Sequence, residues 1–221
     1  MADEQTPPPA RPLLMERMLA FSDGVFAIVL TLLALDLRLP PGADDAHLAL
    51  AAERIAGPLT AFVLSFAIVG VFWLVHLSTM RALAKFDWVV AAMNVVFLFT
   101  ITLTPFATAL VGKFGTQGVA WRFYCLTILL ISIALCSLIA VSHRDEANIL
   151  HADHHGRFWY RLSRCATPGV AFAIGLALSV AGFARLSSLC WLLVPVLMLA
   201  VRLGFHGRPG IMLAPSRSEP A

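Results

Sequence analysis

The sequence contains few charged residues. Asp, Glu, Lys and Arg make up 13% of its 221 residues, against about 25% in an ordinary soluble domain. Hydrophobic residues account for 59%, and the mean hydropathy is +0.83. This composition excludes a typical soluble domain and indicates an integral membrane protein. The formal net charge of +3 is too small to favour a nucleic-acid partner.

The sequence also lacks the close cysteine spacing of a metal or redox motif. No CxxC pair occurs, and the four cysteines are widely separated, mostly within apolar runs. We therefore expect buried free thiols, and neither a disulfide framework nor a structural metal site. The cysteines are Cys125, Cys136, Cys165 and Cys190.

The N-terminus lacks the basic segment of a signal peptide. Its first residues, MADEQTPPPARP, are polar and proline-rich, and the first apolar run ends in LDLRLP, without a small-residue cleavage site. We therefore expect this run to be a retained transmembrane helix. The predicted organisation is a polar N-terminus at 1–16, one membrane domain at 17–205 and a polar tail at 206–221.

Six apolar runs reach or approach the roughly 20 residues that a helix needs to cross a bilayer. The pattern does not alternate as β-barrel strands do, so the predicted fold class is an all-α integral membrane protein with six transmembrane helices. The runs cover 18–37, 56–79, 88–111, 119–142, 166–184 and 187–205.

Lys and Arg are unevenly distributed between the two sides of such a six-helix chain. With both termini inside, eleven of the sixteen basic residues lie on the inner side and five on the outer side. The positive-inside rule then predicts a multi-pass protein of the cell membrane, surrounded by lipid, with both termini cytoplasmic. The five outer residues are Arg38, Arg54, Lys113, Arg122 and Arg185.

The first apolar run carries polar residues that a simple membrane anchor would avoid. Between Arg17 and Leu37 it includes Ser22, Asp23 and Thr31. Ionisable groups at membrane depth are energetically costly and usually mark a functional segment. We therefore expect this helix to line a cation pathway.

The helix has an apolar face that contains one hydroxyl group. Ile28, Thr31, Leu32 and Leu35 share this face at spacings i, i+3, i+4 and i+7. Around a common axis, copies of the aliphatic residues would form a hydrophobic constriction, and copies of Thr31 would form a ring of hydroxyls. In a monomer the same face would be ordinary packing or lipid contact, and both interpretations remain open.

Asp23 lies on another face, about six residues from the inner end of the helix. His76 and Asn94 lie at a similar depth in the second and third runs. An unpaired carboxylate at this depth would be costly. We therefore expect Asp23 and Ser22 to bond with His76, Asn94 or both, with Arg17 adding charge near the inner mouth. We favour an inter-helix anchor over direct contact with a permeant ion.

Arg17, Phe21, Ser22 and Asp23 form an RxxxFSD motif, followed by GVFAIVLTLLALDL. This pattern resembles the prokaryotic branch of the transmembrane protein 175 family, whose animal member is an endolysosomal potassium channel. Helices four to six match that family only in number and hydrophobicity. The resemblance continues through Trp73, His76, Asn94 and Pro105. We therefore group Trp73 with Arg17, Phe21, Ser22, Asp23, His76 and Asn94 as the motif and inter-helix polar network.

The resemblance implies a homotetramer in which the first helix of each subunit lines a central pore. It places the constriction at Ile28, Leu32 and Leu35, and a pore-facing hydroxyl at Thr31. The sequence has no re-entrant filter of the TVGYG type, and the family is similar in this respect. The implied function is a potassium-permeable cation channel rather than an enzyme, with K+ as the permeant ion and no cofactor.

Two other functions remain open. A proton-coupled secondary transporter would use Asp23 and His76 as a relay, although we see no inverted repeat or broken helix that would favour it. A membrane enzyme would use Ser22 with Asp23 and His76. Adjacent side chains on a helix point about 100° apart, which is poor geometry for a catalytic triad.

Overall fold

The structure, a computed structural model, describes residues 10–35, 37, 48–83, 85–144 and 155–205. Within these ranges the chain forms eight helices. They are α1 (Ala10–Leu35), α2 (Leu48–Met80), α3 (Trp88–Ile101), α4 (Thr104–Phe114), α5 (Gly118–Ser142), α6 (His155–Val180), α7 (Ala184–Ser187) and α8 (Cys190–Gly204).

Six stretches of the described residues are long and apolar enough to cross a membrane, which confirms the predicted all-α fold with six spans. The third span combines α3 with α4, and the sixth combines α7 with α8. The six stretches are Leu13–Leu35, Ile55–Met80, Trp88–Phe114, Gly118–Ser142, Phe158–Val180 and Ala184–Gly204.

Several helices begin earlier than their apolar runs predict. α1 starts at Ala10 rather than residue 18, α2 at Leu48 rather than 56, and α6 at His155 rather than 166. Hydropathy marks only the part of a helix suited to the hydrocarbon core, whereas backbone hydrogen bonding continues into the polar interface. Residues 10–16 of the predicted polar N-terminus (1–16) are helical and belong to α1, while residues 1–9 and the predicted tail 206–221 lie outside the described residues.

Pro105 divides the third span. It stands in the first turn of α4, and α3 ends at Ile101. Proline has no backbone N–H and its ring crowds the preceding turn, so an uninterrupted helix is unfavourable here. At the other end of the span, the Asp87 side chain accepts a 2.7 Å hydrogen bond from the Val89 backbone N–H and caps α3.

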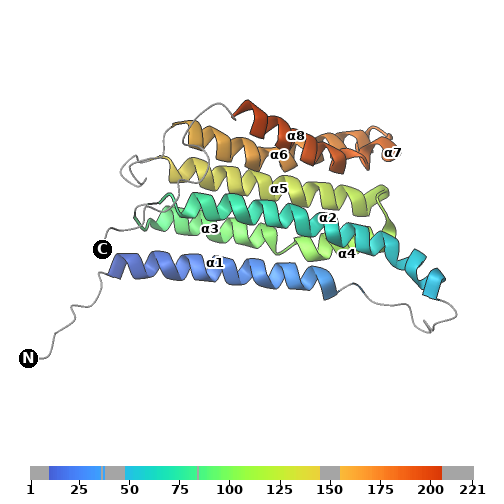
Figure 1. The fold of residues 1–221 in the computed structure, drawn as a ribbon, viewed down its shortest axis with the longest axis horizontal. Coiled ribbons are helices and arrows are strands. Elements are labelled where there is room, and N and C mark those ends of the chain that lie inside the picture. The colour runs from blue at the N-terminus through green and yellow to red at the C-terminus, as the bar shows by residue number, and fades with distance from the viewer. Residues whose placement is uncertain (1–9, 36, 38–47, 84, 145–154, 206–221) are drawn as a thin grey trace, which may run out of the picture.

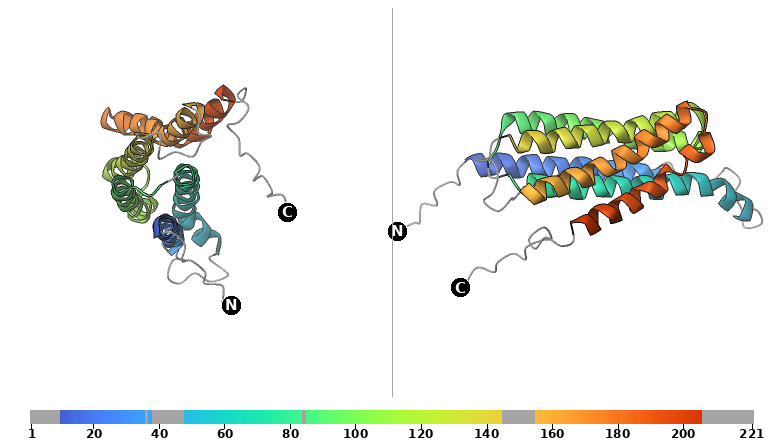
Figure 2. Two further views of the ribbon diagram at one scale, coloured as in Figure 1. Left: turned by 90° about the vertical axis from the view of Figure 1, so that its left-hand side faces the viewer. Right: turned by 90° about the horizontal axis from the view of Figure 1, so that it is seen from above.

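The long helices lie side by side, with α1 and α8 at opposite edges of the array (Figures 1 and 2). α5 lies between them and packs against α6, α3 and α4. Its side chains supply much of the core: Trp121, Tyr124, Ile128, Ile131 and Leu135 are fully buried.

One end of the array gathers the beginnings of α1, α3 and α6 and the ends of α2, α5 and α8, on the left of Figure 1. We call it the basic end because most described Lys and Arg residues lie there. Under the predicted orientation it faces the cytoplasm. Its basic residues with described side chains are Arg17, Arg81, Lys85, Arg144, Arg161, Arg164 and Arg202.

Candidate functional site

α1 has one face fixed against the rest of the subunit. Ser22, Phe26, Val29 and Leu33 are all at most 2% exposed and recur at helical spacing. This stripe packs on α2, α3 and α4. It therefore determines which residues of α1 point away from the subunit.

A chain of hydrogen bonds joins α1, α3 and α2 within this packed face. The Asn94 side-chain amide donates to Ser22 Oγ at 2.9 Å, and Ser22 Oγ donates to the Met18 carbonyl at 2.9 Å. His76 Nε2 lies 2.8 Å from Asn94 Oδ1. Because the amide NH2 group of Asn94 faces Ser22, Asn94 Oδ1 accepts a hydrogen bond from the His76 Nε2–H group. Ser22, His76 and Asn94 are buried, so each bond forms away from solvent.

Two phenylalanines enclose the His76 ring. The Phe97 ring stacks on it with a centroid distance of 5.3 Å, and the Phe26 ring lies 5.6 Å away. We did not predict these contacts. Phe26 lies four residues after Ser22, and Phe97 lies three residues after Asn94, so each shares a helix face with a residue of the hydrogen-bonded chain. This spacing is the sequence pattern from which the contacts with His76 could have been predicted.

Asp23 has a different partner from the two that we expected. The Trp73 indole N–H donates to Asp23 Oδ1 at 2.9 Å, in place of a bond from His76 or Asn94. Successive side chains on a helix diverge by about 100°, so burying Ser22 turns Asp23 towards the exposed edge of α1. The other two motif residues, Arg17 and Phe21, are also exposed.

The face of α1 that points away from the subunit contains the four residues predicted to line a pore. Ile28 is 60% exposed, Leu32 42% and Leu35 60%, and Thr31 is exposed between them. Thr31 Oγ1 donates to the Ile28 carbonyl at 2.8 Å, which leaves its lone pairs available to an external cation. We call these four residues the aliphatic face.

Comparison with known proteins relates the chain to one family. A family model described as "Endosomal/lysosomal potassium channel TMEM175" matches residues 17–105. Residues 17–105 belong to the TMEM175 family. This TMEM175 segment contains the RxxxFSD motif, the hydrogen-bonded chain of Ser22, Asn94 and His76, and the aliphatic face. It ends at Pro105, in the first turn of α4.

Two curated relatives are similar to this chain beyond this segment. A potassium channel from Chryseobacterium sp. (strain P1-3) is 28% identical over 185 residues, which cover 80% of this chain and 92% of the relative. The human endosomal/lysosomal proton channel TMEM175 is 23% identical over 189 residues. That match covers 83% of this chain but only 37% of the human protein.

A solved structure shares the fold. The crystal structure of a lysosomal potassium-selective channel TMEM175 homologue from Chamaesiphon minutus superposes with a TM-score of 0.67 and 25% identity. The match covers 85% of this chain and 97% of the other. The reported relatives are named as channels, so the comparisons place the chain among channel proteins rather than enzymes.

We expect Asn94→Ala to destabilise the TMEM175 segment by about 1–2 kcal/mol, because the change removes two inter-helix hydrogen bonds and leaves His76 Nε2 buried without an acceptor. Thermal unfolding of the detergent-solubilised protein measures the effect. Thr102→Ala is the control, because Thr102 is exposed and its side chain bonds only to the Phe99 carbonyl. Equal unfolding midpoints for both variants would show that the hydrogen-bonded chain contributes nothing to stability.

Proposed function

We propose that this chain is the subunit of a homotetrameric, potassium-permeable cation channel in which α1 of every subunit lines a central pore. The observation that carries the proposal is the division of α1 into two faces. One face is held in the subunit by Ser22 and its buried neighbours. α1 lies at the edge of the helix array (Figure 2), and the residues of its aliphatic face are exposed.

Rings of these side chains would supply both a barrier and a site for the ion. Ile28, Leu32 and Leu35 would form successive apolar constrictions that gate by dewetting. Thr31 lies between Ile28 and Leu32, so its hydroxyls would replace part of the hydration shell of a passing cation. Because K+ holds its water less tightly than Na+, such a pore favours K+ without a re-entrant filter.

The names of the relatives support potassium as the permeant ion. The Chryseobacterium relative, of which this chain covers 92%, is named a potassium channel, and the Chamaesiphon structure is titled potassium-selective. We also propose that the channel resides in the cell membrane with both termini cytoplasmic, which places the basic end inside. Membrane lipids are then its surroundings, and copies of the same chain are its partners.

The proposal predicts that purified protein reconstituted into liposomes carries potassium down its gradient. Flux well above that of empty liposomes is the expected result, with potassium exceeding sodium. The oligomeric mass is measured on the same preparation. Intact tetramers without cation flux would contradict the proposal.

The second candidate is a proton-coupled transporter; the human relative is named a proton channel, which supports proton movement but not coupled transport. That mechanism would use Asp23 and His76 as its relay. The two side chains bond to different partners, Asp23 to Trp73 and His76 to Asn94, so a relay would need these bonds to rearrange. Potassium accumulation against its own gradient, driven by an imposed proton gradient, would favour the transporter.

A further inference from the structure

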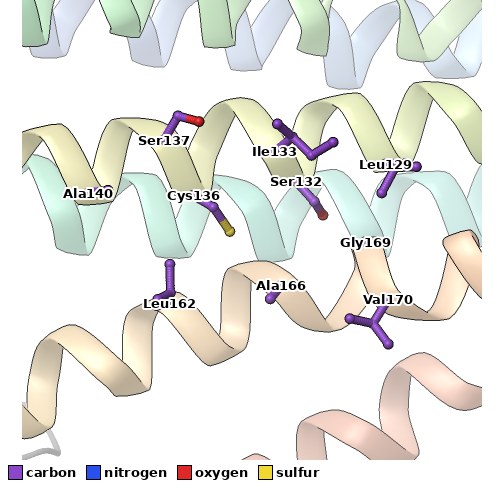
Figure 3. Close-up of a pocket in the computed structure, with 10 residues that line it drawn as sticks. All are labelled: Leu129, Ser132, Ile133, Cys136, Ser137, Ala140, Leu162, Ala166, Gly169 and Val170. Atoms are coloured by element: carbon purple, nitrogen blue, oxygen red, sulfur yellow. The ribbon is translucent and has the colours of Figure 1, made fainter.

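A groove lies on the surface between α5 and α6, in a part of the chain outside the TMEM175 segment (Figure 3). Its volume is about 470 Å³, and its lining is almost wholly apolar. This size falls within the range of about 300–1,000 Å³ typical of small-molecule sites. The residues that line it include Leu129, Ser132 and Ala140 of α5 and Leu162, Ala166 and Gly169 of α6.

A close helix crossing lies near one end of the groove. A Cβ on Gly169 would lie 2.6 Å from Ser132 Cβ, so the two backbones can meet here only because residue 169 is a glycine. Ser132 Oγ also donates to the Cys165 carbonyl at 3.1 Å and fastens the crossing. From Gly169 towards Leu162, α6 diverges from α5, which opens the groove towards the basic end (Figure 3).

The length of the groove matches one leaflet of a bilayer. On α5 it runs from Leu129 to Ala140, about 16 Å at 1.5 Å per residue. Half of a hydrocarbon core of about 30 Å is about 15 Å. Ala140 lies two residues before the end of α5 at Ser142, so the groove extends from mid-membrane to the interface. A single acyl chain has this reach and chemistry.

The open mouth of the groove lies where α5 ends and α6 begins. α5 ends at Ser142, and the next two residues are its C-cap His143 and the exposed Arg144. On α6, Leu162 is preceded at i−4 and i−3 by Phe158 and Trp159. The His143 and Phe158 rings lie 4.5 Å apart, and Trp159 is 55% exposed beside them. Aromatic and basic residues at the ends of transmembrane helices are typical of the lipid headgroup region.

Among the described residues of α5, α6 and α8, the charged side chains are all basic, whereas Asp145 and Glu146, which follow Arg144 in the sequence, lie outside the described residues. The described residues 88–144 and 158–205 contain no Asp or Glu, whereas Arg144, Arg161, Arg164 and Arg202 all lie at the basic end of α5, α6 and α8. Basic residues beside a gap between transmembrane helices on the cytoplasmic side favour anionic lipid headgroups. The positive-inside rule alone explains a basic end, but it does not explain an apolar groove that leads to it.

We propose that this groove binds an anionic phospholipid of the inner leaflet, with one acyl chain between α5 and α6 and the phosphate at Arg144 and Trp159. The bound lipid fills the space left where α6 diverges from α5 and so supports the outer helices of the subunit. This role is independent of ion permeation, and it gives the part of the chain beyond Pro105 a function of its own.

Native mass spectrometry of the full-length protein in detergent tests the site, with palmitoyl-oleoyl phosphatidylglycerol and the matching phosphatidylcholine as probes. The wild-type protein is expected to retain phosphatidylglycerol in preference to phosphatidylcholine. Arg144→Gln is expected to weaken phosphatidylglycerol binding about fivefold while leaving phosphatidylcholine binding unchanged. Arg202→Gln, at the same end of the array but outside the groove, is the matched control and is expected to bind as the wild type does.

A second variant, Ala166→Phe, fills the groove without changing its charge and is expected to reduce binding of both lipids. The oligomeric mass in the same spectra shows whether the assembly is intact. Equal retention of the two lipids by the wild type would overturn the proposal, and so would equal losses in Arg144→Gln and Arg202→Gln. Unchanged binding in Ala166→Phe would show that the lipids sit elsewhere, including the case in which a neighbouring subunit covers the groove.

Discussion

Replacing Ile28 with Asn is expected to increase potassium conductance and to reduce the preference for potassium over sodium. The substitution exchanges a whole ring of apolar side chains for hydrogen-bonding amides, so water remains in the constriction. A barrier lowered by about 1.4 kcal/mol corresponds to about a tenfold higher rate. We therefore expect a conductance increase of about tenfold, with the reversal potential in mixed potassium and sodium moving towards zero.

Two matched variants separate this effect from a general perturbation of the membrane helices. Ile28→Val keeps an apolar side chain at the same position and is expected to conduct and select as the wild type does. Ile174→Asn places the same amide on α6, where Ile174 is also exposed, and is expected to leave the reversal potential unchanged. If Ile28→Asn and Ile174→Asn gave the same reversal potential as the wild type, Ile28 would not face the ion pathway.

Gly169→Ala is expected to destabilise the subunit by about 1–3 kcal/mol, the usual range for overpacking a close contact. The added Cβ would meet Ser132 Cβ at 2.6 Å, a contact that moving a flexible side-chain end cannot relieve. α5 and α6 must then separate, which breaks the bond between Ser132 Oγ and the Cys165 carbonyl. The unfolding midpoint in detergent should fall by about 2–12 °C.

Gly70→Ala also replaces glycine with alanine, but this variant is expected not to destabilise the protein. Gly70 lies inside α2, and a Cβ there would meet nothing within 4 Å. Alanine favours a helix over glycine by about 1 kcal/mol, so this variant should unfold at or above the wild-type temperature. Equal midpoints for Gly169→Ala and Gly70→Ala would mean that α5 and α6 do not cross closely at Gly169.

The number of spans could be predicted from hydropathy because each apolar run is long enough to require a membrane crossing. The helix ends could not. The start of α6 at His155 lies in a polar segment that hydropathy does not score as membrane, although its backbone remains helical. The division of the third span follows from the chemistry of Pro105, but whether a proline bends a helix or begins a new one depends on the packing around it.

Depth along the helices correctly brought Ser22, His76 and Asn94 to one level, since equal numbers of residues from the same membrane face give equal depth. Depth does not determine direction around the helix axis. For this reason Trp73, although assigned to the inter-helix polar network, was not predicted as the partner of Asp23. Gly169 itself indicates that its helix can pack closely. Its partner Ser132 could not be predicted, because it depends on the angle between two helices rather than on a pattern within either.

The central claim is that the aliphatic faces of α1 from different subunits meet, and oxidative cross-linking tests it most directly. Ile28→Cys and Leu199→Cys introduce thiols at positions of similar exposure, 60% and 56%, on opposite edges of the array. The wild-type protein, with its four native cysteines, sets the background. We expect oxidation to link subunits through Cys at position 28 and not at position 199. Dimers formed only by the Leu199→Cys protein would contradict a pore lined by α1.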